Sequence, residues 1–202
     1  MKFSCPVVLA SASPRRKELL AGMGVEFTAV PADVEEIAPD SGLSARETVI
    51  RNAVMKAAAV SGLYPDALVI GSDTVVVCDG RIFGKPRSES DALSMLKTLS
   101  GRKHEVMSGV ALIREKDGLN RSFAEDSLVA FKDLTDETIR EYMRLVNVMD
   151  KAGAYAIQEH GELILAGLTG SLSNVIGLPV ERLSRELELT GLVLPPSPER
   201  KN

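Results

Sequence analysis

Val7-Val8-Leu9-Ala10-Ser11-Ala12-Ser13-Pro14-Arg15-Arg16-Lys17-Glu18-Leu19-Leu20 has the pattern of a buried strand that leads directly into a helix with a basic first turn. The apolar run of residues 7–10 predicts the strand, and Ser13-Pro14 predicts an N-cap and the first helical residue. Arg15-Arg16-Lys17 then fall where the helix dipole disfavours cations. A phosphate bound there would meet backbone N–H groups, hydroxyls and guanidiniums together. The alternative is a solvated basic helix start.

The composition is that of a globular protein with room for one large domain or two small lobes. The chain has 202 residues, 45% of them hydrophobic and 26% charged. Its net charge of −4, its aromatic content of 4% and the absence of Trp argue against a nucleic-acid-binding module. Cys5 and Cys78 do not suggest a disulfide framework. With no secretory signal or membrane-length apolar run in view, we expect a cytoplasmic protein without a membrane partner.

The order of the expected elements indicates a mixed α/β fold with one long central sheet. Two lobes with a cleft between them would fit this order. Strands are expected over residues 67–71, 75–78, 106–114, 122–132 and 163–168. Helices are expected over residues 47–60 and 90–99, from an N-cap at Thr135 to about residue 146, and over 179–189.

Two short motifs supply further candidates for chemistry. In Gly71-Ser72-Asp73-Thr74, Asp73 is expected at the end of a buried strand, where open α/β sheets form ligand crevices. Its carboxylate could act as a base towards water or hold a divalent cation; the alternative is an Asp that caps a turn. Lys85, in Phe83-Gly84-Lys85-Pro86, offers a mobile charge for phosphate or is simply a turn lysine.

Two weaker signals complete the set. Asp33-Val34-Glu35-Glu36 offers hard oxygen ligands or is a solvated acidic loop. Gln158, expected to be buried, could read a pyrimidine edge or make a structural hydrogen bond. His104 and His160 lack a zinc-site spacing and are interpreted as structural or surface residues. Together the candidates suit metal-assisted attack of water on a nucleotide polyphosphate.

Several motifs in one order resemble the Maf family, also called septum-formation-inhibitor or nucleoside triphosphate pyrophosphatase proteins. They cover about residues 7 to 183. The motifs are Leu9-Ala10-Ser11-Ala12-Ser13-Pro14-Arg15-Arg16, Val34-Glu35-Glu36, Gly71-Ser72-Asp73-Thr74-Val75-Val76, Gly84-Lys85-Pro86, Leu99-Ser100-Gly101-Arg102-Lys103-His104-Glu105-Val106, Asp150-Lys151-Ala152-Gly153-Ala154-Tyr155-Ala156-Ile157-Gln158 and Gly170-Ser171 with Asn174-Val175-Ile176-Gly177-Leu178-Pro179.

The resemblance implies a two-lobed, mixed-sheet fold like that of inosine triphosphate pyrophosphatases, with the active site in the central cleft. It implies a single domain over residues 1–194. The proline-rich, charged end of the sequence separately predicts a flexible tail over 195–202. It further implies hydrolysis of a nucleoside triphosphate to the monophosphate and pyrophosphate, with Mg²⁺ or Mn²⁺ as cofactor. By the same resemblance, Asp73 is the base and, with Glu36, a metal ligand. The phosphate-binding residues it implies are Ser11, Arg15, Arg16, Lys56 and Lys85.

Arg15, Thr74 and Gln158 match positions that sort substrates in the family, and their combination resembles the branch that acts on dTTP and UTP. Modified pyrimidine nucleotides fall within the same expectation. The alternatives are the 7-methyl-GTP branch and a nucleotide-binding regulator of cell division with little turnover. Ser108 stands where many members have Thr, and residues 146–149 depart from the usual polar turn. No nucleic-acid partner is expected, and a homodimer is left open.

Overall fold

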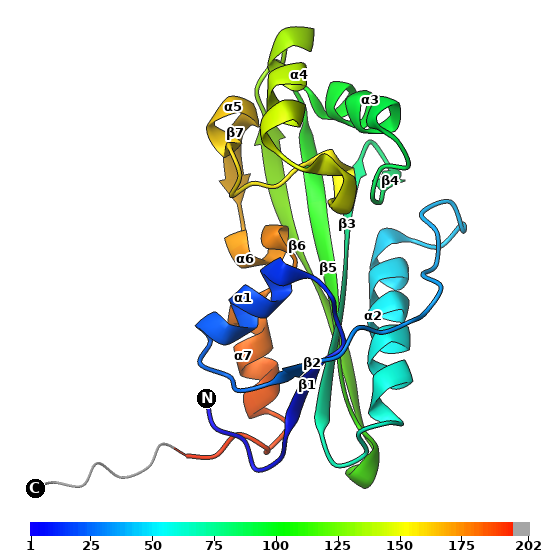
Figure 1. Cartoon of the computed structure of the whole chain (residues 1–202), viewed down its shortest axis with the longest axis vertical. Coiled ribbons are helices and arrows are strands. Elements are labelled where there is room, and N and C mark those ends of the chain that lie inside the picture. Colours follow the sequence, from blue (N-terminus) through cyan, green and yellow to red (C-terminus); the bar gives the residue numbers. More distant parts are fainter. Residues whose placement is uncertain (196–202) are drawn as a thin grey trace, which may run out of the picture.

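The computed structural model describes residues 1–195 and shows a mixed α/β protein built on one long, seven-stranded sheet (Figure 1). The strand order is β2-β1-β3-β5-β6-β7, and β4 pairs with β3. Strands β1, β2 and β3 run parallel, whereas the other pairings are antiparallel. The strands are β1 (Val7–Leu9), β2 (Thr28–Ala29), β3 (Leu68–Cys78), β4 (Arg81–Phe83), β5 (Lys103–Arg114), β6 (Leu119–Phe131) and β7 (Leu165–Thr169).

Helices cover both faces of the sheet at one end and gather around its other end. In Figure 1, α2 lies on one face and α1, α6 and α7 lie on the other, while α3, α4 and α5 lie at the far end of β5 and β6. The helices are α1 (Pro14–Gly22), α2 (Ala45–Ser61), α3 (Glu89–Leu99), α4 (Asp136–Leu145), α5 (Gly161–Ile164), α6 (Leu172–Ile176) and α7 (Val180–Glu188).

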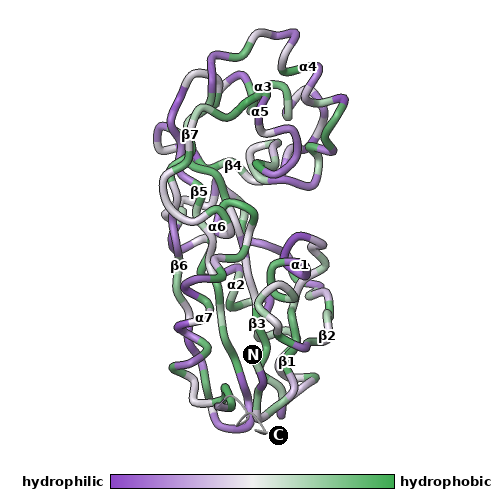
Figure 2. The backbone as a smooth tube through the Cα atoms, turned by 90° about the vertical axis from the view of Figure 1, so that its left-hand side faces the viewer, coloured by the Kyte–Doolittle hydropathy of each residue, from purple (hydrophilic) through white to green (hydrophobic). Residues whose placement is uncertain are grey.

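Among the buried hydrophobic clusters, one lies in each of the two predicted lobes. One contains Leu9, Ile70 and Leu112 with residues of α1 and α7, and the other contains Phe83, Phe131 and Tyr142 with residues of α3 and α4. Figures 1 and 2 both place β1 and β2 towards one end of the molecule and α3 and α4 at the other. The long strands β3, β5 and β6 run through both lobes, so the lobes share one sheet.

The course of β3 corrects the prediction for Asp73. We expected a strand that ends near Gly71, but β3 is one strand of 11 residues and Asp73 lies in its interior. Strand β1 pairs with Leu68–Ile70, and β4 pairs with Val76–Cys78 on the same side. Within the described residues, the segment 71–75 therefore has a strand neighbour only in β5. The edge of β3 is therefore unpaired at Asp73 because β1 and β4 stop on either side of it, and not because β3 itself ends there.

Two glycines bring α2 close to the sheet beside Asp73. A Cβ atom on Gly71 would lie 2.2 Å from the backbone oxygen of Ala53, and one on Gly109 would lie 2.3 Å from that of Val49. Because Gly109 is the register partner of Asp73 on β5, this close packing sets the distance between α2 and the candidate base.

Apart from the break expected within β3, most expected elements are confirmed, and one more needs correction. Ser13 accepts a hydrogen bond from the N–H of Arg16, and Thr135 accepts one from that of Thr138, so both N-caps are confirmed. The strand expected over residues 163–168 is wrong at its start, because Gly161–Ile164 forms a helical turn and β7 begins at Leu165. Apolar runs this short do not separate helix from strand. The predicted tail, apart from Pro195, lies outside the described residues.

His104 is confirmed as a structural residue and His160 as a surface residue. The His104 ring is 2% exposed, packs edge-on against Phe131 and Tyr155, and its Nε2 lies 2.9 Å from the Tyr155 hydroxyl. Burial lowers the pKa of His104 from 6.5 to about 4. The ring is therefore neutral in the folded protein at neutral pH.

This burial predicts a loss of stability in mild acid. The unfolded chain binds a proton at His104 near pH 6.5 and the folded chain only near pH 4, so stability falls as the pH drops through that window. From pH 7.5 to 5 this group contributes a loss of about 2 kcal/mol in the free energy of unfolding. Urea unfolding at both pH values measures it. His104→Gln should flatten the pH dependence, whereas exposed His160→Gln should not; equal slopes in the two variants would contradict the assignment.

No helix within residues 1–195 is both long enough and apolar enough to cross a membrane.

Candidate active site

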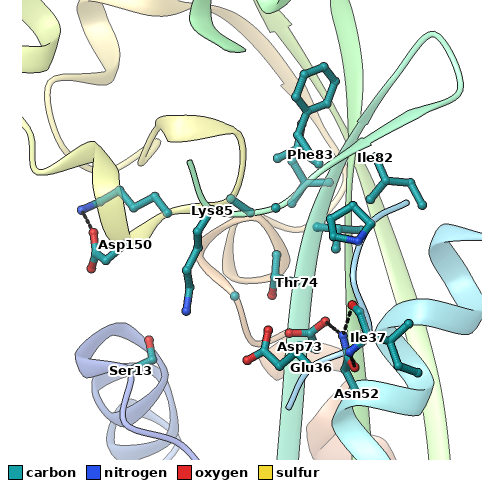
Figure 3. Close-up of a pocket in the computed structure, with 18 of the residues that line it drawn as sticks. Ser13, Glu36, Ile37, Asn52, Asp73, Thr74, Ile82, Phe83, Lys85 and Asp150 are labelled. Carbon is teal, nitrogen blue, oxygen red and sulfur yellow. Dashed lines mark hydrogen bonds and ion pairs between the residues drawn. The ribbon is translucent and has the colours of Figure 1, made fainter. Parts of the chain in front are cut away.

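A cavity of about 1250 Å³ opens where β3 lacks a strand neighbour on one side (Figure 3). Both lobes line it, so the predicted central cleft is present. Every residue predicted for the site lies in its wall. These residues are Ser11, Arg15, Arg16, Glu36, Lys56, Asp73, Thr74, Lys85 and Gln158.

A buried ammonium group links the two predicted metal-binding carboxylates. Lys56 Nζ lies 2.7 Å from Asp73 Oδ1 and 2.8 Å from Glu36 Oε1. Lys56 and Asp73 are almost fully buried, whereas the Glu36 side chain is 45% exposed. Lys56 was predicted to bind phosphate; in this structure it already forms ion pairs with two carboxylates. This arrangement leaves the Glu36 carboxylate accessible from the cavity.

Asn52 is a functional candidate that the sequence analysis missed. Its Nδ2 donates to Asp73 Oδ2 at 3.0 Å, and its side chain also bonds both the N–H and the C=O of Ile37. It therefore holds the Asp73 carboxylate and the acidic loop that carries Glu36 at the same time. The sequence signal was available, because Asn52 and Lys56 are polar residues four apart on the buried face of α2.

Arg16 is held inside the cleft instead of extending into water. Its Nε donates to the Gly177 carbonyl at 2.9 Å and its Nη2 to Thr74 Oγ1 at 3.1 Å. Burial lowers the pKa of the Arg16 guanidinium, while the charges of Asp73 and Glu36 act in the opposite direction. The solvated alternative for the basic helix start is therefore wrong for Arg16, whose removal would also break structural hydrogen bonds.

Arg15 spans the cleft. Its Nη1 lies 3.2 Å from Asp150 Oδ2, and its Nη2 donates to the Asp150 carbonyl at 3.3 Å. Lys151 Nζ holds the other carboxylate oxygen at 2.9 Å. Asp150 belongs to one of the family motifs, but it was not predicted as a site residue. It connects α1 of one lobe to the segment of the other lobe that leads to Gln158.

Hydroxyls and a free lysine complete the cationic side of the cavity. Ser11 Oγ accepts from the N–H of Ser13, and Ser13 Oγ accepts from that of Arg16, so both hydroxyls lie at the start of α1. Lys85 is exposed and, within residues 1–195, forms no ion pair. Figure 3 shows its side chain extending from the opposite side of the pocket towards the space between Ser13 and Glu36. This geometry suits an anion bound at a helix N-terminus.

Gln158 lines the cavity but is exposed, so the expectation of a buried amide is wrong. It follows the buried run 153–157 at the point where the chain reaches the surface. Its amide can therefore meet a ligand only at the rim of the cleft.

The carboxylates of Asp73 and Glu36 fit a hard divalent cation whose other ligands come from water and substrate. Within residues 1–195, no group of three or more His, Cys, Asp or Glu side chains could enclose a metal ion. Mg²⁺ commonly binds through one or two carboxylates together with water and substrate phosphates. Two carboxylates facing one cavity match that mode better than a complete protein cage.

Fold and site together define an α/β protein with a central cleft suited to a nucleotide polyphosphate. The Maf-like protein family matches residues 6–190, and the chain belongs to this family. It is 47% identical over 186 residues to the dTTP/UTP pyrophosphatase of Akkermansia muciniphila, covering 92% of this chain and 97% of that one. The dTTP/UTP pyrophosphatase of Phocaeicola vulgatus is 46% identical, with 90% and 94% covered.

A solved structure supports the fold. The Ham1 protein of Staphylococcus aureus superposes with a TM-score of 0.54 at 14% sequence identity, covering 92% of this chain and 99% of that one. This likeness supports the mixed α/β fold and does not bear on the substrate.

Proposed function

We propose that this protein hydrolyses dTTP and UTP to the monophosphate and pyrophosphate. The observation that carries the proposal is that one cavity joins the Asp73–Lys56–Glu36 group to the start of α1 and Lys85. The relatives named dTTP/UTP pyrophosphatase, which match almost the full length of the chain, support the choice of substrate.

The residues supply a base and a set of charge-stabilising groups. Asp73 accepts a proton from the water that attacks the α-phosphorus, while the bond from that phosphorus to the bridging oxygen breaks and pyrophosphate leaves. Lys56 and Asn52 hold the two oxygens of the base, so its orientation is set before substrate binds. Arg15, Arg16 and Lys85 stabilise the charge that moves onto pyrophosphate.

Glu36 and Asp73 are the residues that would hold Mg²⁺ or Mn²⁺. The cation, when bound, neutralises phosphate oxygens and raises the electrophilicity of the phosphorus. Glu36 is the more accessible of the two carboxylates. Its position at the cavity wall suits shared coordination with a phosphate.

Alternation along β3 separates the general base from the nucleobase. Asp73 contacts α2, whereas Thr74 contacts Arg16 of α1 on the other side of the strand. The attacking water therefore belongs on the α2 side with Asp73, and the nucleobase belongs near Thr74 and the exposed amide of Gln158. Uracil and thymine present an N–H between two carbonyls, which an amide and a hydroxyl can match in part.

Base selectivity provides a direct test. We expect a clear preference for dTTP and UTP over dCTP and CTP, because a hydrogen-bonding site rejects an analogue that leaves its polar groups unpaired. Gln158→Glu should erode this preference more than it weakens triphosphate binding. The ratio of kcat/KM for UTP and CTP measures the effect. Gln158→Leu separates lost hydrogen bonds from added charge, and an unchanged ratio in both variants would contradict the role of Gln158.

A substrate panel tests the proposed function against its alternatives. Pyrophosphate release would be measured for canonical triphosphates and 7-methyl-GTP with Mg²⁺ and with Mn²⁺. Preference for 7-methyl-GTP would move the protein to the other branch, and tight nucleotide binding without turnover would favour the regulator. The cytoplasmic location and the homodimer stay predictions.

A further inference from the structure

A chain of hydrogen bonds runs from the cleft into the interior of the sheet. Arg16 Nη2 lies 3.1 Å from Thr74 Oγ1, Thr74 Oγ1 lies 2.9 Å from Ser108 Oγ, and Ser108 Oγ lies 3.0 Å from the Asn174 carbonyl. Thr74 lines the cavity, whereas Ser108 and Asn174 are 0% exposed. Of the two hydroxyls, only that of Thr74 can contact substrate.

The chemistry of the two ends fixes the direction of every hydrogen bond between them. A guanidinium can only donate, so Thr74 Oγ1 accepts from Arg16. A carbonyl can only accept, so the single hydroxyl proton of Ser108 points to Asn174. The contact between the two hydroxyls then needs the proton of Thr74, which must point to Ser108. Both protons are used, and Thr74 keeps only a lone pair for a ligand.

The interior end of the chain is held firmly. Ser108 is the register partner of Thr74 on β5, so the sheet itself keeps the two hydroxyls together. Asn174 Nδ2 donates to the Val106 carbonyl and to Ser127 Oγ, each at 3.0 Å. The Gly177 N–H also donates to the Asn174 carbonyl. Because Ser108 is fully buried, no solvent replaces these partners, and a reversed proton order would lose the buried hydrogen bond from Ser108 to the Asn174 carbonyl.

We propose that Ser108 is a positioning residue for base selection, acting through the direction in which it orients the Thr74 hydroxyl. The Thr74 oxygen then accepts a hydrogen bond from the N3–H of uracil or thymine, whereas it repels the N3 lone pair of cytosine. This inference rests on the proposed function, in which Thr74 faces the base. Gln158 contributes to base selection from the rim of the cleft. The buried chain of hydrogen bonds determines whether the Thr74 hydroxyl donates or accepts.

Two variants of equal shape test the inference. Ser108→Thr and Ser108→Val add the same bulk to the buried site, but only Thr keeps the hydroxyl. We expect Ser108→Thr to retain the wild-type ratio of kcat/KM for UTP over CTP. Ser108→Val frees the Thr74 proton and should lower that ratio about tenfold, mainly through faster CTP cleavage. A ratio that Ser108→Val leaves unchanged, or that both variants lower equally, would overturn the inference.

The wild type distinguishes failure of this inference from failure of the proposed function. Equal cleavage of UTP and CTP would overturn the inference while leaving the pyrophosphatase activity intact. Cleavage of neither would overturn the proposed function. The proton order is then read without substrate by neutron diffraction of the deuterated protein. A Thr74 deuteron directed at Ser108 Oγ supports the inference, and one directed into the cavity overturns it.

Discussion

Asp73→Asn is expected to lower kcat by about 10²-fold or more, the scale of a positioned general base. The amide keeps the size of the carboxylate but cannot accept the proton of the attacking water. It also removes a negative charge that faces Lys56 at 2.7 Å, so the charge balance beside the phosphates changes. The new amide offers one oxygen to the two donors Lys56 Nζ and Asn52 Nδ2, so only one of them keeps its acceptor. The measurement is pyrophosphate release from UTP at saturating substrate and saturating Mg²⁺.

Asp126→Asn serves as the matched control. Asp126 is an exposed carboxylate on β6 that pairs with Arg46, and it does not line the cavity. Its loss should leave kcat within about twofold, because exposed ion pairs contribute little. Near-normal turnover by Asp73→Asn, with fold and nucleotide binding intact, would remove Asp73 from its role as base.

The local features of the fold could be predicted because they depend on neighbouring residues. The cap at Ser13, the helix that follows Pro14 and the antiparallel pair β5–β6 all follow from short-range pattern. The position of Asp73 could not, because the edge of β3 is opened by where β1 and β4 stop. That boundary is a property of the sheet and leaves no mark in the sequence around Asp73.

Side-chain partners across the cleft were also beyond sequence reasoning. The helix dipole alone made Arg16 unfavourable at the start of α1, but a carbonyl 161 residues away and the hydroxyl of Thr74 provide its partners. Likewise, the family resemblance assigned Lys56 to phosphate, and its contacts with Asp73 and Glu36 could not be predicted because they depend on the close approach of α2 to the sheet. Residue type and family resemblance predicted which groups line the cavity, and tertiary packing determined what each group contacts.

Lys56→Met is expected to lower the free energy of unfolding by about 3–5 kcal/mol, which is large compared with the stability of most domains. Lys56 is 7% exposed, and its removal leaves the buried Asp73 carboxylate without its cationic partner. Methionine fills most of the volume, so the loss reports charge rather than a cavity. Urea unfolding at pH 7.5 measures it. Lys97→Met, which breaks an exposed ion pair with Asp136, should cost less than about 1 kcal/mol.

A double variant decides whether the uncompensated charge is the cause. If Lys56→Met destabilises because it strands the Asp73 carboxylate, then adding Asp73→Asn removes that charge and should restore part of the lost stability. Glu36 remains able to meet solvent because nearly half of its side chain is exposed, so it adds little to the effect. Losses that simply add in the double variant would show that Lys56 stabilises the protein by packing. Recovery would show that Lys56 is needed because it neutralises the buried carboxylate of Asp73, the proposed general base.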